Sequence, residues 1–168
     1  MTKDEIKILS KCTALSDECL VEIGRITAHF ALLERDLIHF THNLLGLPEN
    51  MARSITSELS FRGLQQLASS LLKERLPTKL ENFESILRRV SKCEEKRNMI
   101  LHSLWGMGQP KPDGTHTVIR TKFSAKQKKG LNLVREEMTA RDLQKIAEEM
   151  SVAAYDVEAF NSSIRQNN

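Results

Sequence analysis

The fold is decided by residues 94–105, which read EEKRNMILHSLW and mark the end of a long predicted helix. That helix begins at Pro77, a residue suited to the first helical turn, and continues to about Trp105. Its apolar residues recur every three or four positions, the spacing that places side chains on one helix face. They are Phe83, Ile86, Val90, Cys93, Leu101 and Leu104. At Gly106 this pattern stops.

Three further helices are predicted before this one. The first follows the N-cap signal Ser16-Asp17 and ends at the stop signal Gly46-Leu47-Pro48. A short second helix follows Pro48, and a third runs from Phe61 to Leu76. Each carries apolar residues at helical spacing, which indicates that each helix buries one face.

Residues 106–136 differ from the rest of the chain in their glycines, prolines and strand-like runs. The runs at Thr115–Phe123 and Leu131–Glu136 predict a small β-hairpin or a long functional loop. Thr139, with Asp142 three positions on, then resembles a capping box that begins a last helix. We therefore expect an all-α fold, an up-and-down helical bundle forming a single domain over residues 1–168. A β-hairpin-like insertion precedes the last helix.

The composition excludes several classes of protein. Hydrophobic residues make up 40% and charged residues 28% of the 168, which is typical of a globular domain and not of a disordered chain. No apolar run approaches the roughly 20 residues that span a bilayer, so we expect no membrane partner. Three cysteines without metal-binding spacing indicate reduced thiols, and with them a cytoplasmic protein.

The opening stretch also holds the main chemical signal, Arg97, Asn98 and His102. On a helical wheel Arg97 lies near the middle of the apolar stripe, where a guanidinium is costly unless it is paired. His102 lies about 140° around the helix and about 7.5 Å further along, and Asn98 is one turn before it. The three side chains are therefore expected to converge on one helix end.

Glu34 is an unusual residue of the first helix, because it is an acid within that helix's apolar arc. A carboxylate and a guanidinium that both face inward are natural partners, so we expect a Glu34–Arg97 pair. Two interpretations remain open. The residues form a functional site, or they form a structural ion pair beside a histidine that complements the helix dipole.

At these residues the sequence resembles the HEPN superfamily, the helical domains of prokaryotic toxins and of RNA-processing and defence proteins. The family signature is an arginine, usually followed by a polar residue, and then a histidine after four to six intervening positions on a late helix. Arg97, Asn98 and His102 match it, with four residues between Arg97 and His102. The resemblance covers about residues 16–105. One departure is Leu104, where some family toxins carry a tyrosine that a partner enzyme modifies.

The resemblance implies a metal-independent endoribonuclease that acts as a homodimer without a cofactor, as a toxin or defence effector. It implies His102 as general acid/base, Arg97 as the phosphate stabiliser, and Asn98 as the group that orients His102 or the phosphate. Glu34 is the supporting residue. Cleavage through the RNA 2′-hydroxyl needs an acid and a base, which two facing motifs of a dimer would supply. RNA and an antitoxin or other protein are the expected partners.

A basic stretch follows the site directly. Between Lys111 and Lys129 the chain carries six cations against a single acid, Asp113. The stretch either contacts an RNA backbone or is a solvated hairpin with ordinary lysines. The candidate RNA-binding residues are Lys111, Arg120, Lys122, Lys126, Lys128 and Lys129.

No metal site is expected. His29, His39 and His42 belong to the first helix, but their angles around it spread too widely for one ion, and no cysteine or acid completes a known spacing. These histidines are therefore interpreted as surface residues.

The alternative to a nuclease is a non-catalytic helical dimer of the same fold, which binds RNA, a nucleotide or a protein partner. In that case Arg97 and Glu34 are structural. The nuclease requires Arg97 and His102 to be exposed in a cleft shared by two chains. The binding protein requires Arg97 to be buried and paired within one chain.

Overall fold

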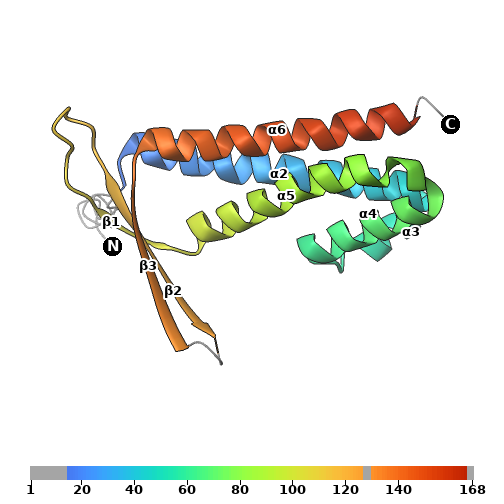
Figure 1. Cartoon of the computed structure of the whole chain (residues 1–168), viewed down its shortest axis with the longest axis horizontal. Coiled ribbons are helices and arrows are strands. Elements are labelled where there is room, and N and C mark those ends of the chain that lie inside the picture. The colour runs from blue at the N-terminus through green and yellow to red at the C-terminus, as the bar shows by residue number, and fades with distance from the viewer. Residues whose placement is uncertain (1–14, 127–129, 166–168) are drawn as a thin grey trace, which may run out of the picture. The chain divides into compact units, whose positions relative to one another are not determined.

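Helices make up most of the computed structural model (Figure 1). The structure describes the backbone of residues 15–126 and 130–165, and the side chains of residues 15–123 and 133–165. The predicted mostly helical fold is confirmed, and each predicted helix is present. The helices are α2 (Asp17–Leu45), α3 (Glu49–Thr56), α4 (Phe61–Arg75), α5 (Leu80–Leu101, after a 3-10 turn at Pro77–Lys79) and α6 (Ala140–Arg165).

A three-stranded antiparallel sheet precedes α6, in the order β1-β2-β3. β2 (Val118–Lys126) and β3 (Gly130–Met138) form the predicted hairpin. The third strand, β1 (Leu104–Met107), was not predicted, and the prediction that α5 continues to Trp105 is wrong. The reason is pairing, because Leu104 and Trp105 lie opposite Thr121 and Arg120 of β2. Ladder bonds to a distant strand override the local helical pattern.

The chain forms two compact units, each built from separate segments. Unit 1 comprises residues 1–26 and 96–147, and unit 2 comprises residues 27–95 and 148–168. Within each unit, only the residues that the structure describes are considered below. Whether the two units act as one domain, as the sequence predicts, stays a prediction.

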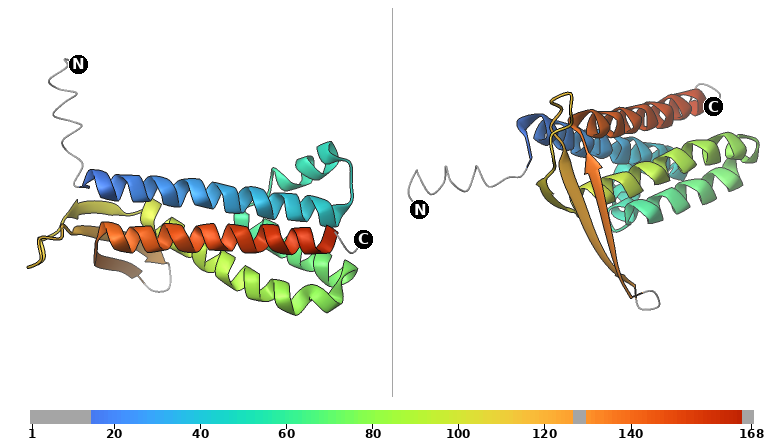
Figure 2. Two further views of the ribbon diagram at one scale, coloured as in Figure 1. Left: turned by 90° about the horizontal axis from the view of Figure 1, so that it is seen from above. Right: turned by 60° about the vertical axis from the view of Figure 1, so that its left-hand side comes forward.

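The core of unit 2 is built around an aromatic cluster. The rings of Phe40 and Phe83 have centroids 4.5 Å apart, and Phe160 lies 5.2 Å from Phe83 and 5.7 Å from Phe40. These three side chains come from α2, α5 and α6, which run side by side in Figure 1 and in both views of Figure 2. A second pair, Phe30 and Phe61, joins α2 to α4 at 4.7 Å. Each ring is among the buried apolar residues, so this cluster fixes how the helices of unit 2 pack.

The sheet of unit 1 leads directly into α6 through the predicted capping box. The Thr139 hydroxyl accepts from Asp142 N at 3.2 Å, and Asp142 Oδ2 accepts from Thr139 N at 3.0 Å. These bonds satisfy main-chain donors that the first helical turn leaves open. The buried residues of unit 1 include Cys19, Ile26, Ile100, Val118, Met138 and Leu143.

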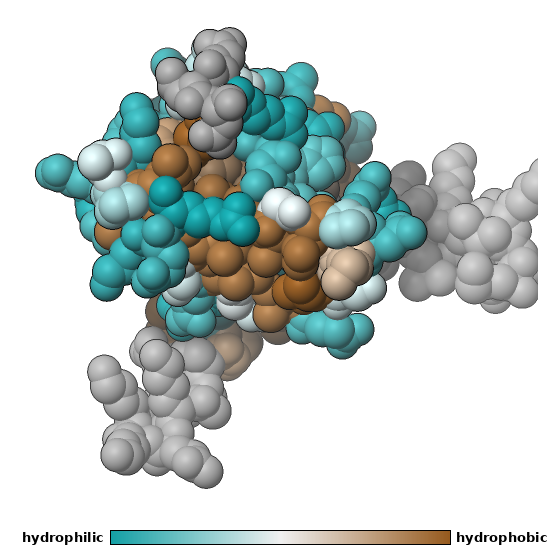
Figure 3. All heavy atoms as spheres, turned by 90° about the vertical axis from the view of Figure 1, so that its right-hand side faces the viewer, coloured by the Kyte–Doolittle hydropathy of each residue, from teal (hydrophilic) through white to brown (hydrophobic). Residues whose placement is uncertain are grey.

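The end of α2 in unit 2 is fixed by Gly46 and Arg75. Gly46 has a φ of 62°, a left-handed conformation that favours glycine, and its N–H donates to His42 O at 3.1 Å. Arg75 Nη2 donates to Leu45 O at 3.0 Å and so satisfies a carbonyl that the helix end leaves open. Figure 3 shows apolar surface on the face that carries this helix end. A hollow there is lined by Phe40, Leu44, Arg75, Leu76 and Ile164, among others.

Over the residues that the structure describes, none of the helices combines the length and the apolar character that crossing a membrane requires.

Candidate functional site

Arg97, Asn98 and His102 lie at the C-terminal end of α5, in unit 1, and form the Arg97–His102 site. Arg97 is half-buried, and its Nη1 donates to Asn98 Oδ1 at 2.8 Å. The Asn98 carbonyl accepts from His102 N at 3.3 Å and from Lys122 Nζ at 3.4 Å. His102 is exposed and lies one residue beyond the last helical residue. The structure thus holds the guanidinium against Asn98 and leaves the imidazole in solvent.

Arg120 and Ser103 connect the sheet to the residue that follows His102. Arg120 Nη1 donates to Ser103 Oγ at 3.2 Å, and Ser103 Oγ donates to Met99 O. Arg120 Nε and Nη2 both donate to Glu136 Oε2, at 3.2 and 2.7 Å. Such charge-assisted bonds are stronger than neutral ones. This network fixes the turn between α5 and β1 next to the site.

The prediction that Arg120 contacts RNA is therefore corrected. Arg120 is only 1% exposed and is the largest fully buried side chain among the described residues. Arg120 is buried because its side chain lies on the same face of β2 as Val118, which is buried as well. A buried guanidinium that is bonded to Glu136 and Ser103 has no surface to offer a phosphate.

The other candidate RNA-binding residues are not equivalent. Lys122 is half-buried and lies at the Arg97–His102 site through its bond to Asn98. Lys111 is exposed and close enough to Asp142 to help lower the pKa of that carboxyl, although the Thr139 hydrogen bond is the larger cause. The side chains of Lys126, Lys128 and Lys129 lie outside the described residues. The structure therefore brings Lys122 to the predicted site.

Glu34 belongs to unit 2 and Arg97 to unit 1. Glu34 is half-buried and lines a pocket of unit 2. The predicted Glu34–Arg97 pair stays a prediction.

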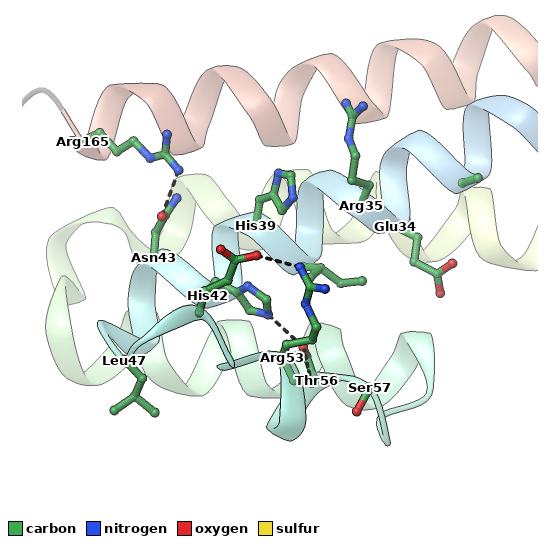
Figure 4. A pocket seen from close by; sticks show the side chains of 13 residues that line it. Glu34, Arg35, His39, His42, Asn43, Leu47, Arg53, Thr56, Ser57 and Arg165 are labelled. Atoms are coloured by element: carbon green, nitrogen blue, oxygen red, sulfur yellow. Dashed lines mark hydrogen bonds and ion pairs between the residues drawn. The ribbon is translucent and has the colours of Figure 1, made fainter. Parts of the chain in front are cut away.

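That pocket is a hollow of about 740 Å³ formed by α2, α3 and the end of α6 (Figure 4). We call it the arginine–histidine pocket. Its lining residues are Ala31, Glu34, Arg35, Ile38, His39, His42, Asn43, Leu47, Glu49, Arg53, Thr56, Ser57 and Arg165. Three arginines and two histidines thus face two glutamates.

His42 is a half-buried ionisable group of this pocket. The Thr56 hydroxyl lies 3.1 Å from Ala52 O and forms a 2.9 Å hydrogen bond with His42 Nε2, whose direction depends on the His42 tautomer. Burial lowers the pKa of His42 below its ordinary value of 6.5, and the neighbouring His39 and Arg53 lower it further. Glu49 acts in the opposite direction and raises that pKa.

Sequence reasoning missed this pocket by treating His39 and His42 as unrelated surface residues. Arg35, His39 and His42 recur at helical spacing on α2, so they could have been found as one polar face. Arg53 and Arg165 carried no such signal, because only folding brings α3 and the end of α6 to that face. Among the described residues, no group of histidine, cysteine, aspartate and glutamate side chains is arranged to hold a metal ion.

Comparison of the chain with models of protein families, with characterised proteins and with solved structures finds no match in any of the three.

Proposed function

We propose that the chain is a metal-independent endoribonuclease of HEPN type that cleaves RNA at the Arg97–His102 site, as a homodimer. One observation carries the proposal. The Arg97 guanidinium is held against Asn98, while His102 is exposed at the next turn of the same helix end. A fixed cation and a histidine on one helix end supply two of the groups that attack by a 2′-hydroxyl on phosphate requires.

Lys122 adds to this arrangement. Its ammonium group lies 3.4 Å from Asn98 O, so a second cation contacts the residue whose side chain holds the Arg97 guanidinium. Cations at such a site stabilise the negative charge that develops on a pentacoordinate phosphorus. The Arg120 network then acts indirectly, by fixing Ser103 next to His102.

A homodimer is supported by exposed apolar side chains on the sheet of unit 1. Leu104, two residues after His102, is 67% exposed, and Phe123 and Leu133 are each 55% exposed. The strand register places all three on one face, since Leu104 lies opposite Thr121 and Phe123 lies opposite Leu133. Exposed apolar patches favour contact with another protein surface. A second copy would bring a second His102 and so supply both an acid and a base.

One observation favours the non-catalytic alternative, a helical dimer that binds RNA, a nucleotide or a protein. Arg97 is half-buried and bonded to Asn98 within its own chain, which suits a structural role as well as a catalytic one. Mutation separates the two functions. If Arg97 is structural, replacing Arg97 lowers the stability of the protein, and replacing His102 has no effect on RNA cleavage.

The test is cleavage of structured and single-stranded RNAs in EDTA by the wild type and by His102→Ala. We expect the wild type to leave 2′,3′-cyclic phosphate ends and the variant to lose about 100-fold or more in rate. His116→Ala is the matched control, since His116 is an exposed histidine of unit 1 outside the motif, and it keeps wild-type activity. Equal cleavage by wild type and His102→Ala would contradict the proposal. Loss in both variants would contradict it as well, because the effect would then not be specific to His102.

A further inference from the structure

The arginine–histidine pocket of unit 2 is independent of the proposed nuclease site. Its lining comes from residues far apart in the chain, such as Asn43 and Arg165, which are 122 positions apart. Its volume of about 740 Å³ lies in the range of small-molecule sites. Its composition then decides which class of ligand fits.

The arginines of the pocket differ in how firmly they are engaged. Arg35 Nη2 lies 2.7 Å from Asp36 Oδ1, and that carboxylate is nearly buried. Arg53 Nη2 lies 2.6 Å from Glu49 Oε1, but these side chains are 70% and 72% exposed. Arg165 Nη2 donates to Asn43 Oδ1 at 2.9 Å, and that partner is a neutral amide. Arg53 and Arg165 are therefore the guanidiniums most open to a new anion.

Glu49 acts as a weak internal counter-ion. An exposed ion pair contributes little to stability, because water screens it. A ligand with two negative charges on one phosphate can offer Arg53 two short bonds in place of one. Such a ligand would displace the Glu49 carboxylate at little cost.

His42 gains a positive charge when it is protonated. Both of its ring nitrogens then donate, so Nε2 keeps its 2.9 Å hydrogen bond to the Thr56 hydroxyl. The charged and titratable groups that bear on His42 are His39 of α2 and Glu49 and Arg53 of α3. Glu34, Arg35 and Arg165 line the same pocket (Figure 4). A bound anion favours the protonated histidine, and the protonated histidine favours the anion.

The pocket lining also includes three apolar residues, Ala31, Ile38 and Leu47, spread along α2 and the segment after it. Apolar contacts of this kind suit the organic portion of a ligand.

We propose that the arginine–histidine pocket binds a small phosphorylated organic molecule, whose phosphate is held by Arg53 and Arg165 next to His39 and His42. The proposal stands apart from the Arg97–His102 site and from the nuclease activity. It assigns a ligand site to unit 2.

The test is calorimetric titration of the full chain with pyrophosphate, near pH 6.5. We expect binding that weakens roughly tenfold in Arg53→Gln and in Arg165→Gln, because each loses charge-assisted bonds to the anion. Glu49→Gln is expected to bind more tightly, because it removes the competing carboxylate. Arg88→Gln is the matched control, an exposed arginine of α5 in the same unit that does not line the pocket.

Two further readouts keep the outcome decisive. The His42 ring resonance should report a higher pKa with pyrophosphate bound, and the affinity should rise as pH falls from about 8 to about 6. Circular dichroism confirms that each variant is folded. Absence of pyrophosphate binding overturns the proposal, as do variants of Arg53 and Arg165 that bind like Arg88→Gln. Binding of single-stranded RNA without binding of pyrophosphate also overturns it, in favour of a polymer.

Discussion

The basic residues of unit 1 and those of unit 2 show opposite relations between sequence and structure. In unit 1, six cations stand close together between residues 111 and 129, yet Arg120 is buried against Glu136 and Lys111 is exposed near Asp142. In unit 2, Arg53 and Arg165 belong to different helices far apart in the chain, yet they line one pocket. A dense run of charge in sequence therefore does not by itself bring cations to one surface, whereas convergence of separate elements can.

The largest effect is expected from a direct contrast of one arginine from each unit. Arg120→Ala should lower the free energy of unfolding by about 2–4 kcal/mol, because it removes a buried side chain and leaves its bonding partners unsatisfied. Arg53→Ala should change it by less than about 0.5 kcal/mol, because its ion pair is exposed. Urea unfolding followed by circular dichroism measures both. Similar losses in the two variants would remove the contrast.

The capping box of unit 1 should have a smaller effect. Thr139→Val should cost about 1 kcal/mol, because it removes the hydroxyl that accepts from Asp142 N. The hydrogen bond from Thr139 is the main cause that lowers the pKa of Asp142 below 3.8. Stability from that carboxylate is present above its ordinary pKa and is lost as pH falls through the lowered value. In the variant, the free energy of unfolding should fall less steeply as pH is lowered through the acid range. An unchanged acid dependence would count against this hydrogen bond.

Replacing one glycine in each unit should change the free energy of unfolding by similar amounts in opposite directions. Gly46→Ala should destabilise by about 1 kcal/mol, because Gly46 has a positive φ and a Cβ there would lie 3.1 Å from Arg75 Nη1. Gly24→Ala should stabilise by about 0.5–1 kcal/mol, because Gly24 is inside α2 and a Cβ there meets nothing within 4 Å. Thermal unfolding of both variants is sufficient. A shift of the same sign in both would contradict the backbone argument.

The smallest effect is expected at His42. Its folded pKa lies below the ordinary 6.5, so the unfolded chain binds this proton more readily. Its contribution therefore makes the folded state less stable as pH falls below about 6.5, until the folded pKa is passed. His42→Gln should reduce this loss of stability at low pH, while His116→Gln should leave the loss unchanged. Unfolding free energies at several pH values between 8 and 5 decide the matter.

Much of the fold could be predicted from local signals. Pro77, the Ser16-Asp17 pair, the Gly46 stop and the Thr139–Asp142 box each lie at or within a residue or so of an observed helix boundary. These signals act over three or four residues, so the sequence expresses them directly. β1 could not be predicted, because Leu104 and Trp105 adopt a strand through pairing with residues that lie 15 or more positions further on.

The candidate site was predictable only in part. Arg97 bonds to Asn98 at the end of α5, whereas convergence of the His102 side chain with these two stays a prediction. The role of Arg120 was predicted incorrectly, since which face of a strand is buried depends on its register and not on local charge. Pockets lined by several elements, such as that of Arg53 and Arg165, depend on tertiary packing that no local pattern contains.

The edge position of β3 has a consequence for aggregation. In the described part of the sheet β3 is an edge strand, nine residues long, with Leu133 and Val134 exposed near its middle. Such an edge invites a strand of another molecule to pair with it. Arg135, Glu136 and Glu137 follow at once, and all three are exposed. In a parallel, in-register stack each added chain would place like charges on one another, so these residues oppose that form of aggregation. Glu136, which pairs with Arg120 inside the fold, thus also discourages fibre growth between molecules.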